Sequence, residues 1–252
     1  MSVAAIEVRG FGQSFGGVRK LAGLDLDVMR NEILGIIGPA RSGKSTFLCA
    51  LNRLNDLVRG SRHEGTIRID GRDIYEPDVD VVALRRKLGM VFATPVPLPR
   101  SIFENVAFGA RRAGVRSRSE LEVLVRDSLE KGGLWDEVKD RLGTSGLKLS
   151  GGQQQRLCVA RILAVKPEFI LLDEPTSGLD PISTMKIEDS LRKLKKDYTI
   201  VLVTNNTKQA ARVADRTAFF LNGGLVEIGP TAKIFTAPDD QRTDDYLRGR
   251  FG

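Results

Sequence analysis

The sequence predicts an α/β protein whose core is a parallel β-sheet. Short apolar runs at residues 32–37, 169–173 and 199–204 have the length and composition of buried strands, and segments with helical patterning separate them. This alternation favours a parallel sheet, because neighbouring parallel strands need crossover connections that are usually helical. Of the 252 residues, 41% are hydrophobic and 28% are charged, which is typical of a globular protein.

Strands and helices are expected along the whole chain. The expected strands are 6–9, 24–28, 32–37, 66–70, 87–92, 169–173, 199–204 and 217–221, with a hairpin-like turn at 222–228. The expected helical segments are 44–54, 101–132, 150–165, 182–196 and 207–214. Residues 93–165 contain no expected strand, so we interpret this block as a helical insertion.

A phosphate-binding loop is indicated directly after the expected strand 32–37. Residues 38–45 read GPARSGKS and fit the pattern G-x-x-x-x-G-K-[ST] between a strand and a helix. Glycines here let backbone N–H groups converge on phosphate oxygens at a helix N-terminus. Lys44 is expected to reach the β- and γ-phosphates, and the Ser45 hydroxyl is expected to coordinate Mg²⁺. The expected ATP-binding residues of this loop are Gly38, Pro39, Ala40, Arg41, Ser42, Gly43, Lys44, Ser45 and Thr46.

Two carboxylates, Asp173 and Glu174, end the apolar run 169–173. Asp173 is expected to hold Mg²⁺ through water, so Ser45 and Asp173 form the expected metal site. Glu174 is expected to point towards the attacking water as a general base. The alternative is that the two acidic residues form an ordinary solvated turn, which is common at strand ends. Further along the chain, Pro181 follows Asp180, which predicts a helix start with Asp180 as N-cap.

A second anion-binding turn is predicted within residues 149–157, which read LSGGQQQRL. Ser150 and the N–H groups of Gly151 and Gly152 lie at an expected helix start, where the helix dipole favours an anion. An SGG triplet alone is a weak signal. The full LSGGQ sequence between a phosphate loop and an acid-ended strand is a strong one.

These three motifs, in this order, resemble the ATP-binding-cassette (ABC) transporter ATPases. The resemblance implies the P-loop NTPase fold of an ABC ATPase domain, with a RecA-like parallel-sheet core, an antiparallel β subdomain and a helical subdomain. It implies one nucleotide-binding domain over 1–252. Within it, 1–92 and 166–252 would form the core and β subdomain, and 93–165 the helical subdomain.

The same resemblance implies roles for further residues. Phe15 resembles the aromatic residue that stacks on adenine, with Val18 beside it, although an ordinary core aromatic is the alternative for Phe15. Asp180 lies in a segment that resembles the D-loop. Two chains would sandwich two ATP molecules, each γ-phosphate being bound by the signature residues of the opposite subunit. These signature residues are Ser150, Gly151, Gly152 and Gln153. No N-K-x-D motif for guanine is found, so ATP is favoured over GTP.

Segments outside these motifs resemble the ATP-binding subunit of the bacterial phosphate-import (Pst) transporter. They include residues 55–57, 70–75, 134–142, 153–158, 180–184 and 245–252. The resemblance implies a subunit that energises phosphate import from the cytoplasmic face of the cell membrane. Its implied partners are a second copy or another ABC ATPase, two membrane permease subunits and, indirectly, a periplasmic or extracellular phosphate-binding protein.

Three positions depart from the family pattern. The family carries a glutamine that touches Mg²⁺ and the attacking water where this chain has Ala93, and a histidine on the γ-phosphate where it has Asn205. An asparagine amide can still donate a hydrogen bond but is never cationic. With Glu174 still present, we expect Mg-ATP binding to be retained and hydrolysis to be weak. Arg41 replaces a residue that is usually small, and arginine is strained if this position needs a positive φ.

Two other functions compete with the importer. An ATP-dependent dimerisation switch that barely hydrolyses ATP is favoured by Ala93 and Asn205. A DNA-repair or chromosome-type ABC ATPase is suggested only by the net charge of +7, whose basic residues are scattered. Such proteins insert long coiled coils before the signature, and the insertion here is compact, so no nucleic-acid partner is expected.

Membrane segments are not expected in this chain. Its apolar runs are far shorter than the ~20 residues that cross a bilayer, and no signal-peptide pattern is visible. Other subunits would therefore hold the protein at a membrane. The one histidine, His63, is expected in a solvated loop before strand 66–70.

Overall fold

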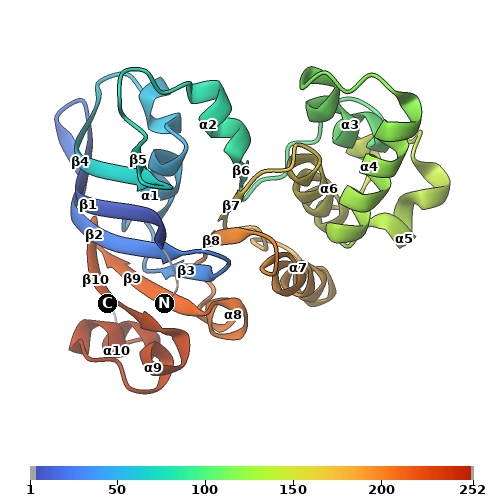
Figure 1. The fold of residues 1–252 in the computed structure, drawn as a ribbon. Helices are drawn as coiled ribbons and strands as arrows, with labels where there is room; N and C mark the ends of the chain where they lie inside the picture. Colours follow the sequence, from blue (N-terminus) through green and yellow to red (C-terminus); the bar gives the residue numbers. More distant parts are fainter. Residues whose placement is uncertain (1–3, 251–252) are drawn as a thin grey trace.

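A computed structural model gives the fold of residues 4–250 (Figure 1). Two β-sheets form one body, and a group of helices lies beside it in the view of Figure 1. Of the segments that carry the likeness to phosphate importers, Phe251 and Gly252 lie outside the described residues.

The central sheet has six strands in the order β10-β9-β3-β8-β7-β6. All adjacent pairs are parallel except β9 with β10. Every residue of β3 and β8 is buried, as expected for strands covered on both faces. The strands are β3 (Ile33–Ile37), β6 (Leu88–Val91), β7 (Phe169–Asp173), β8 (Thr199–Val203), β9 (Arg216–Leu221) and β10 (Gly224–Pro230).

Helices cover both faces of this sheet. On one face, Phe47 and Leu48 of α1 (Lys44–Leu51) pack against alternate strand residues such as Ile36. On the other face, Ile187 of α7 (Pro181–Leu194) and Val213 of α8 (Thr207–Val213) pack against the intervening residues. The parallel α/β core that the sequence predicts is therefore confirmed.

The second sheet is antiparallel, in the order β2-β1-β4-β5. Its strands are β1 (Ala4–Phe15), β2 (Val18–Met29), β4 (Ser61–Ile69) and β5 (Arg72–Asp73). β1 is much longer than the predicted 6–9. Register shifts along β1, with Gly10 at φ 56°, interrupt the simple alternation by which a strand is recognised in a sequence.

His63 corrects one prediction, because it lies within β4 and not in a loop. Its side chain remains exposed, but its ring stacks on Tyr75 with 3.7 Å between ring centroids. His63 is not among the residues that line the cavity at the phosphate loop.

The helical group occupies the stretch between β6 and β7. Its helices have their own core, in which Val106, Leu121, Leu129 and Leu157 are buried. The helices are α3 (Ile102–Arg112), α4 (Arg118–Lys131), α5 (Trp135–Val138) and α6 (Gly151–Leu163), with 3₁₀ turns at Lys139–Arg141 and Gly146–Lys148. The predicted helical segment 101–132 is divided at Gly114, whose φ is 101°.

The remaining helices lie around the sheets. They are the 3₁₀ helix Leu54–Leu57, α2 (Val81–Lys87), α9 (Thr231–Thr236) and α10 (Gln241–Leu247). The helix α2 was not predicted, and the strand expected at 87–92 begins at Leu88. The predicted hairpin at 222–228 is confirmed: Asn222 and Gly223 turn the chain from β9 into β10. None of the helices within residues 4–250 is both long and apolar enough to cross a membrane.

Candidate nucleotide site

The phosphate loop joins the C-terminal end of β3 to the N-terminus of α1. No side chain caps this helix, and within the described chain the N–H groups of Lys44, Ser45 and Thr46 donate to no protein acceptor. Gly43 has φ 100°, and a Cβ there would lie 2.5 Å from Leu21 Cδ2. The loop therefore presents free donors on a backbone path that a side chain would block, which fits a phosphate group.

Lys44 lies on the floor of this loop and is 5% exposed. Its Nζ donates to the carbonyl oxygens of Gly38 and Pro39, both at 2.8 Å. Burial lowers the pKa of Lys44, while the nearby Glu174 and Asp173 carboxylates favour its charged form. A phosphate oxygen would replace two neutral acceptors by a charged one, which makes a stronger hydrogen bond.

Asp173 ends β7 and meets Ser45 at the start of α1. The Ser45 hydroxyl donates to Asp173 Oδ1 at 2.9 Å, and burial raises the pKa of this carboxyl. Mg²⁺ prefers oxygen ligands and is usually held by one or two protein groups together with phosphates and water. The Ser45–Asp173 pair has this donor set, so the residues fit Mg²⁺ bound with a nucleotide. Among residues 4–250 no cluster of three or more His, Cys, Asp or Glu forms a separate metal site.

Glu174 is directed differently from Asp173 by an unusual backbone conformation. Its φ is 49°, and its N–H donates to the Val203 carbonyl of the neighbouring strand at 2.8 Å. Burial raises the pKa of its carboxyl, an N–H of Asn205 opposes that shift, and Lys44 opposes it further. Positive φ in a residue that is not glycine is uncommon and often marks a functional position.

The loop, Glu174 and Asn205 line one cavity of about 450 Å³. Its lining residues are Lys20, Ala40, Arg41, Ser42, Gly43, Lys44, Ser45, Thr46, Glu174 and Asn205. Lys20, on β2, was not predicted. The sequence has no local signal for it, because β2 approaches the phosphate loop only in the folded chain.

Gly223 is a second residue that sequence reasoning missed. Its N–H donates to the Ser42 carbonyl at 3.0 Å, and its carbonyl accepts from the Ala22 N–H at 2.9 Å. A Cβ on Gly223 would overlap the Lys20 carbonyl oxygen. The β9–β10 turn thus ties the phosphate loop to β2. An Asn-Gly turn is visible in the sequence, but its contact with the loop is not.

Arg41 adopts the conformation that its residue type disfavours, with φ 65°. Its side chain is exposed and lines the cavity. The left-handed conformation costs about 1–2 kcal/mol for a residue with a Cβ. The strain expected from the sequence is therefore present.

Phe15 and Val18 face each other across the Gly16–Gly17 turn between β1 and β2. Phe15 is half-buried and Val18 is 57% exposed, so neither is a core residue. Neither lines the 450 Å³ cavity. The structure thus gives both an accessible position at the hairpin without bringing them to the phosphate loop.

Ala93 follows β6 and also lies outside the cavity lining. The loop that carries it is attached to the signature helix, because Gln155 Nε2 donates to the Phe92 carbonyl at 2.9 Å. Asn205, by contrast, is exposed and lines the cavity. Of the two departures from the family pattern, Asn205 therefore lies in the cavity lining and Ala93 does not.

The signature turn forms the N-terminus of α6, away from the cavity of its own chain. Ser150 and Gln153 form a capping box: Ser150 Oγ accepts from the Gln153 N–H at 3.4 Å, and Gln153 Oε1 accepts from the Ser150 N–H at 3.1 Å. Ser150 and Gly151 are exposed and Gly152 is buried. Asp180 is the N-cap of α7, as predicted, and accepts from the Ser183 N–H at 2.9 Å.

The sequence profile described as ABC transporter matches residues 21–177, which is more than half of the chain. The chain belongs to the ABC transporter family. Its fold is the P-loop NTPase fold of an ABC ATPase domain, as predicted, and it is an ATP-binding chain of this family.

Two solved structures place the fold within this family. CbiO1 of Clostridium perfringens, part of the ABC transporter complex CbiONQ, matches with a TM-score of 0.82 and 24% identity over 98% of this chain and 96% of that one. A bacterial Atm1-family ABC exporter with ATP bound matches with a TM-score of 0.79 and 27% identity, over 98% of this chain but 42% of that chain. This chain thus spans less than half of that exporter.

Proposed function

We propose that this chain binds and hydrolyses Mg-ATP as the energising subunit of an ABC importer for inorganic phosphate. One observation carries the ATPase part: the uncapped N-terminus of α1, with Lys44 and Ser45, lines one cavity together with Glu174, and Ser45 is hydrogen-bonded to Asp173. The likeness to CbiO1, which is part of the ABC transporter complex CbiONQ, supports assembly of this chain into a transporter complex.

The residues would divide the reaction among them. Bound Mg-ATP supplies the γ-phosphoryl group that water attacks. The free N–H groups of α1 and the Lys44 ammonium would hold the phosphates, and Ser45 with Asp173 would orient the metal. Glu174 would accept a proton from the attacking water at its carboxylate. Its raised pKa suits this role, because a general base works best when its pKa approaches the working pH.

A dimer would complete the site. Ser150 and Gly151 are exposed and do not line the cavity of their own chain, so a second subunit is needed for the signature turn to meet a phosphate. The second subunit would be another copy of this chain or a different ABC ATPase. Asp180, also exposed at a helix start, would lie in the same interface.

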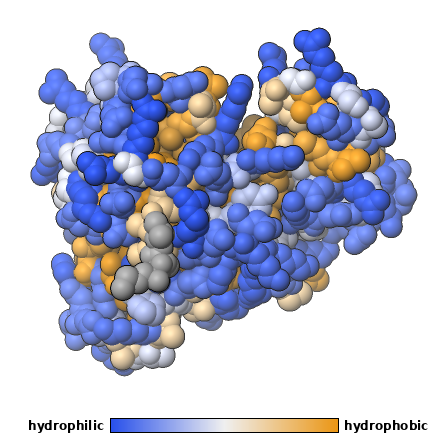
Figure 2. All heavy atoms as spheres, viewed as in Figure 1, coloured by the Kyte–Doolittle hydropathy of each residue, from blue (hydrophilic) through white to orange (hydrophobic). Residues whose placement is uncertain are grey.

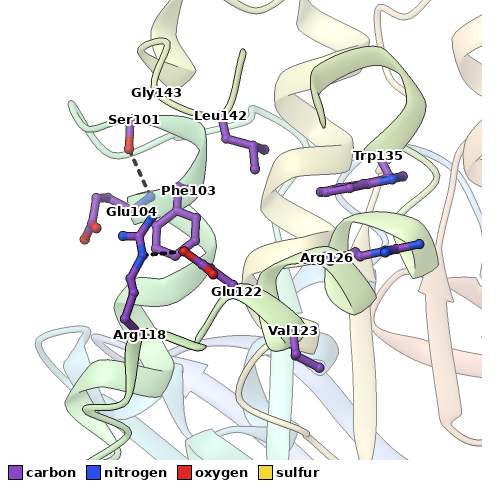
Figure 3. Close-up of a pocket in the computed structure, with 10 residues that line it drawn as sticks. All are labelled: Ser101, Phe103, Glu104, Arg118, Glu122, Val123, Arg126, Trp135, Leu142 and Gly143. Carbon is purple, nitrogen blue, oxygen red and sulfur yellow. Dashed lines mark hydrogen bonds and ion pairs between the residues drawn. The ribbon is translucent and has the colours of Figure 1, made fainter. Parts of the chain in front are cut away.

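A groove on the helical group is the proposed contact with the two permease subunits (Figure 3). It measures about 540 Å³ and is bordered by α3 and α4. Arg118 lies over the Phe103 ring and Arg126 over the Trp135 ring, 4.2 and 5.5 Å from the ring centroids.

Charges around this groove are satisfied within the chain. Arg118 pairs with Glu122 at 2.7 Å and Arg126 with Glu130 at 2.8 Å. A partner segment therefore needs to bring apolar side chains and not a compensating charge. Hydrophobic residues also gather on the helical group in Figure 2, with hydrophilic residues around them. Such docking would hold the chain peripherally at the cytoplasmic face of the membrane.

The phosphate cargo rests on the segments that resemble Pst subunits, among them α5 and the start of α7. The cargo would be delivered by an external phosphate-binding protein and would pass through the permeases, not through this chain. Uptake of labelled phosphate by vesicles containing the permeases and this chain, with sulfate as the control anion, tests this part. ATP-dependent sulfate uptake without phosphate uptake would overturn it.

A regulatory ATP-dependent dimerisation switch is the second candidate, because Ala93 provides no side-chain oxygen and Asn205 no cation at the site. Steady-state ATP hydrolysis by the purified chain decides between the two. We expect slow turnover that rises by about 10²–10³ when Ala93→Gln and Asn205→His restore the missing groups, and that disappears in Glu174→Gln. A chain that binds ATP but shows no Glu174-dependent turnover, with or without its permeases, would support the switch.

A further inference from the structure

Glu137, on the short helix α5, is the centre of a hydrogen-bond network that joins three helices. Oε1 accepts from Arg156 Nη1 at 2.7 Å and from Lys186 Nζ at 2.6 Å. Oε2 accepts from Gln153 Nε2 at 2.8 Å and from Arg156 Nη2 at 3.2 Å. These bonds, with Arg156 first, lower the pKa of Glu137 to about 2, so the carboxylate is ionised at neutral pH.

Two of the three partners belong to the signature helix α6. Gln153 is a member of the capping box, so its side chain contacts both Glu137 and the Ser150 N–H. Arg156 is one turn further along, with its side chain 3% exposed, and it also donates to the Gly133 carbonyl at 2.5 Å. Glu137 of α5 therefore holds the first two turns of α6 through these side-chain hydrogen bonds.

The third partner belongs to α7, the helix that begins at Asp180. Ser183, Lys186 and Ser190 lie three and four residues apart, so they share one face of α7. This face contacts the helical group along its length: a Cβ on Gly152 would overlap Ser183 Oγ, and a Cβ on Gly133 would lie 2.8 Å from Ser190 Oγ. The Ser183 hydroxyl in turn donates to Asp180 Oδ2 at 2.6 Å.

We propose that Glu137 is a positioning residue that holds the signature turn and the Asp180 turn of one chain in a fixed relation. Both turns are exposed, and both would meet the opposite subunit together. The inference rests on the proposed ATP-dependent dimer. Because the relative position of the two turns is already fixed in the monomer, dimerisation does not have to order them. This removes an entropic cost of association.

Lys186 is the clean position at which to break this link. Its side chain is 43% exposed, and Lys186→Met leaves the buried Arg156 paired with Glu137. A Glu137 substitution would leave Arg156 buried without its partner and would destabilise the fold itself. Lys193→Met is the matched control, because Lys193 is an exposed lysine on the same helix and no described residue pairs with it.

The experiment compares these variants in a Glu174→Gln background, which removes the proposed general base and prevents turnover. Sedimentation measures the dimer dissociation constant in saturating Mg-ATP, and a fluorescent ATP analogue measures nucleotide affinity of the monomer at low protein concentration. We expect Lys186→Met to raise the dimer dissociation constant about tenfold, since a C₂ dimer would contain the link twice. The nucleotide affinity of the monomer should change less than twofold in Lys186→Met. The dimer dissociation constant should change less than twofold in Lys193→Met, and Lys186→Arg should restore dimerisation.

Each other outcome is decisive. A Glu174→Gln background that stays monomeric in Mg-ATP overturns a dimer of two copies of this chain, on which the inference rests, and the inference with it. A background that dimerises, with Lys186→Met equal to Lys193→Met, overturns the role of Glu137 alone. An equal loss of dimer affinity and of monomer nucleotide affinity in Lys186→Met would show a general structural effect, which also overturns it.

Discussion

The N-termini of α1 and α6 both contain glycine, Gly43 as the N-cap of α1 and Gly151 as the first residue of α6, yet only α6 has a side-chain cap. The start of α1 has no side-chain cap, and its first N–H groups have no acceptor in the described chain. The start of α6 caps itself, with Ser150 and Gln153 exchanging hydrogen bonds. The first site is therefore ready to bind an anion alone, whereas the second is partly satisfied and gains its function in a dimer.

The difference explains why only one of the two turns lies in a cavity of its own chain. Free N–H groups at a helix start are costly when buried without a partner, so the phosphate loop leaves them open to solvent or ligand. In α6, the capping box of Ser150 and Gln153 satisfies the N–H groups of both residues within the chain, so this helix start needs no partner to be capped. Four substitution experiments test this comparison, in order of decreasing effect.

Lys44→Met should weaken ATP binding by the monomer about 100-fold. The ammonium is buried where phosphate oxygens would lie, and hydrogen bonds to charged groups contribute about 1.5–3 kcal/mol each. Titration with a fluorescent ATP analogue measures the loss. Lys20→Met is the matched control, because Lys20 lines the same cavity but is exposed, and it should cost only a few-fold. If the two substitutions lowered ATP affinity equally, the affinity would depend on the net charge of the cavity and not on the buried position of Lys44.

Ser150→Ala should leave ATP binding by the monomer unchanged and should abolish ATP-driven dimerisation at micromolar protein. It should also lower the free energy of unfolding by about 1 kcal/mol, the usual value of an N-cap. Ser117→Ala is a close control, because Ser117 Oγ caps α4 with the same 3.4 Å bond but lies outside the signature. Urea unfolding and sedimentation separate the shared loss of stability from the loss of dimer. Weaker ATP binding by monomeric Ser150→Ala would break the distinction between the two turns.

Arg41→Gly should raise the free energy of unfolding by about 1 kcal/mol, because glycine adopts positive φ without strain. The same substitution should reduce ATP affinity several-fold, since it removes a cation from the cavity lining. Lys166→Gly provides the control: Lys166 has φ 52° and is exposed, but it does not line the cavity. It should gain stability without losing ATP affinity. An Arg41→Gly variant that binds ATP more tightly would show that Arg41 obstructs the site.

The smallest expected effect is a pH dependence of stability. Burial raises the pKa of Glu174 above its ordinary value of 4.5, so its contribution to stability is greatest at low pH and is lost as the pH rises through the raised pKa. Glu174→Gln should remove part of this decline, and thermal unfolding between pH 4 and 8 measures it. Glu168→Gln, an exposed glutamate at the other end of β7, should leave the decline in place. A wild-type stability that rises over this range owing to Glu174 would contradict the assigned burial.

The local motifs were predictable because short-range hydrogen bonding encodes them. The P-loop lies between a strand and a helix, Asp180 caps its helix, and the parallel core alternates as the sequence indicates. The antiparallel strands were underpredicted, because the register shifts of β1 break the two-residue period on which recognition depends. The strand location of His63 was missed for the same reason, since β4 gains its first half by pairing with the end of β1.

By itself, the sequence determined the phosphate loop, the two carboxylates after β7, the signature turn and the departures at Ala93 and Asn205. Only the tertiary structure decided which of these meet. Ser45 reaches Asp173 across 128 residues because β3 and β7 flank β8 in one parallel sheet, and parallel strands deliver their carboxyl ends to the same edge. The Gly223 contact with the phosphate loop and the Glu137 network arise likewise from packing between distant segments, which no local pattern records.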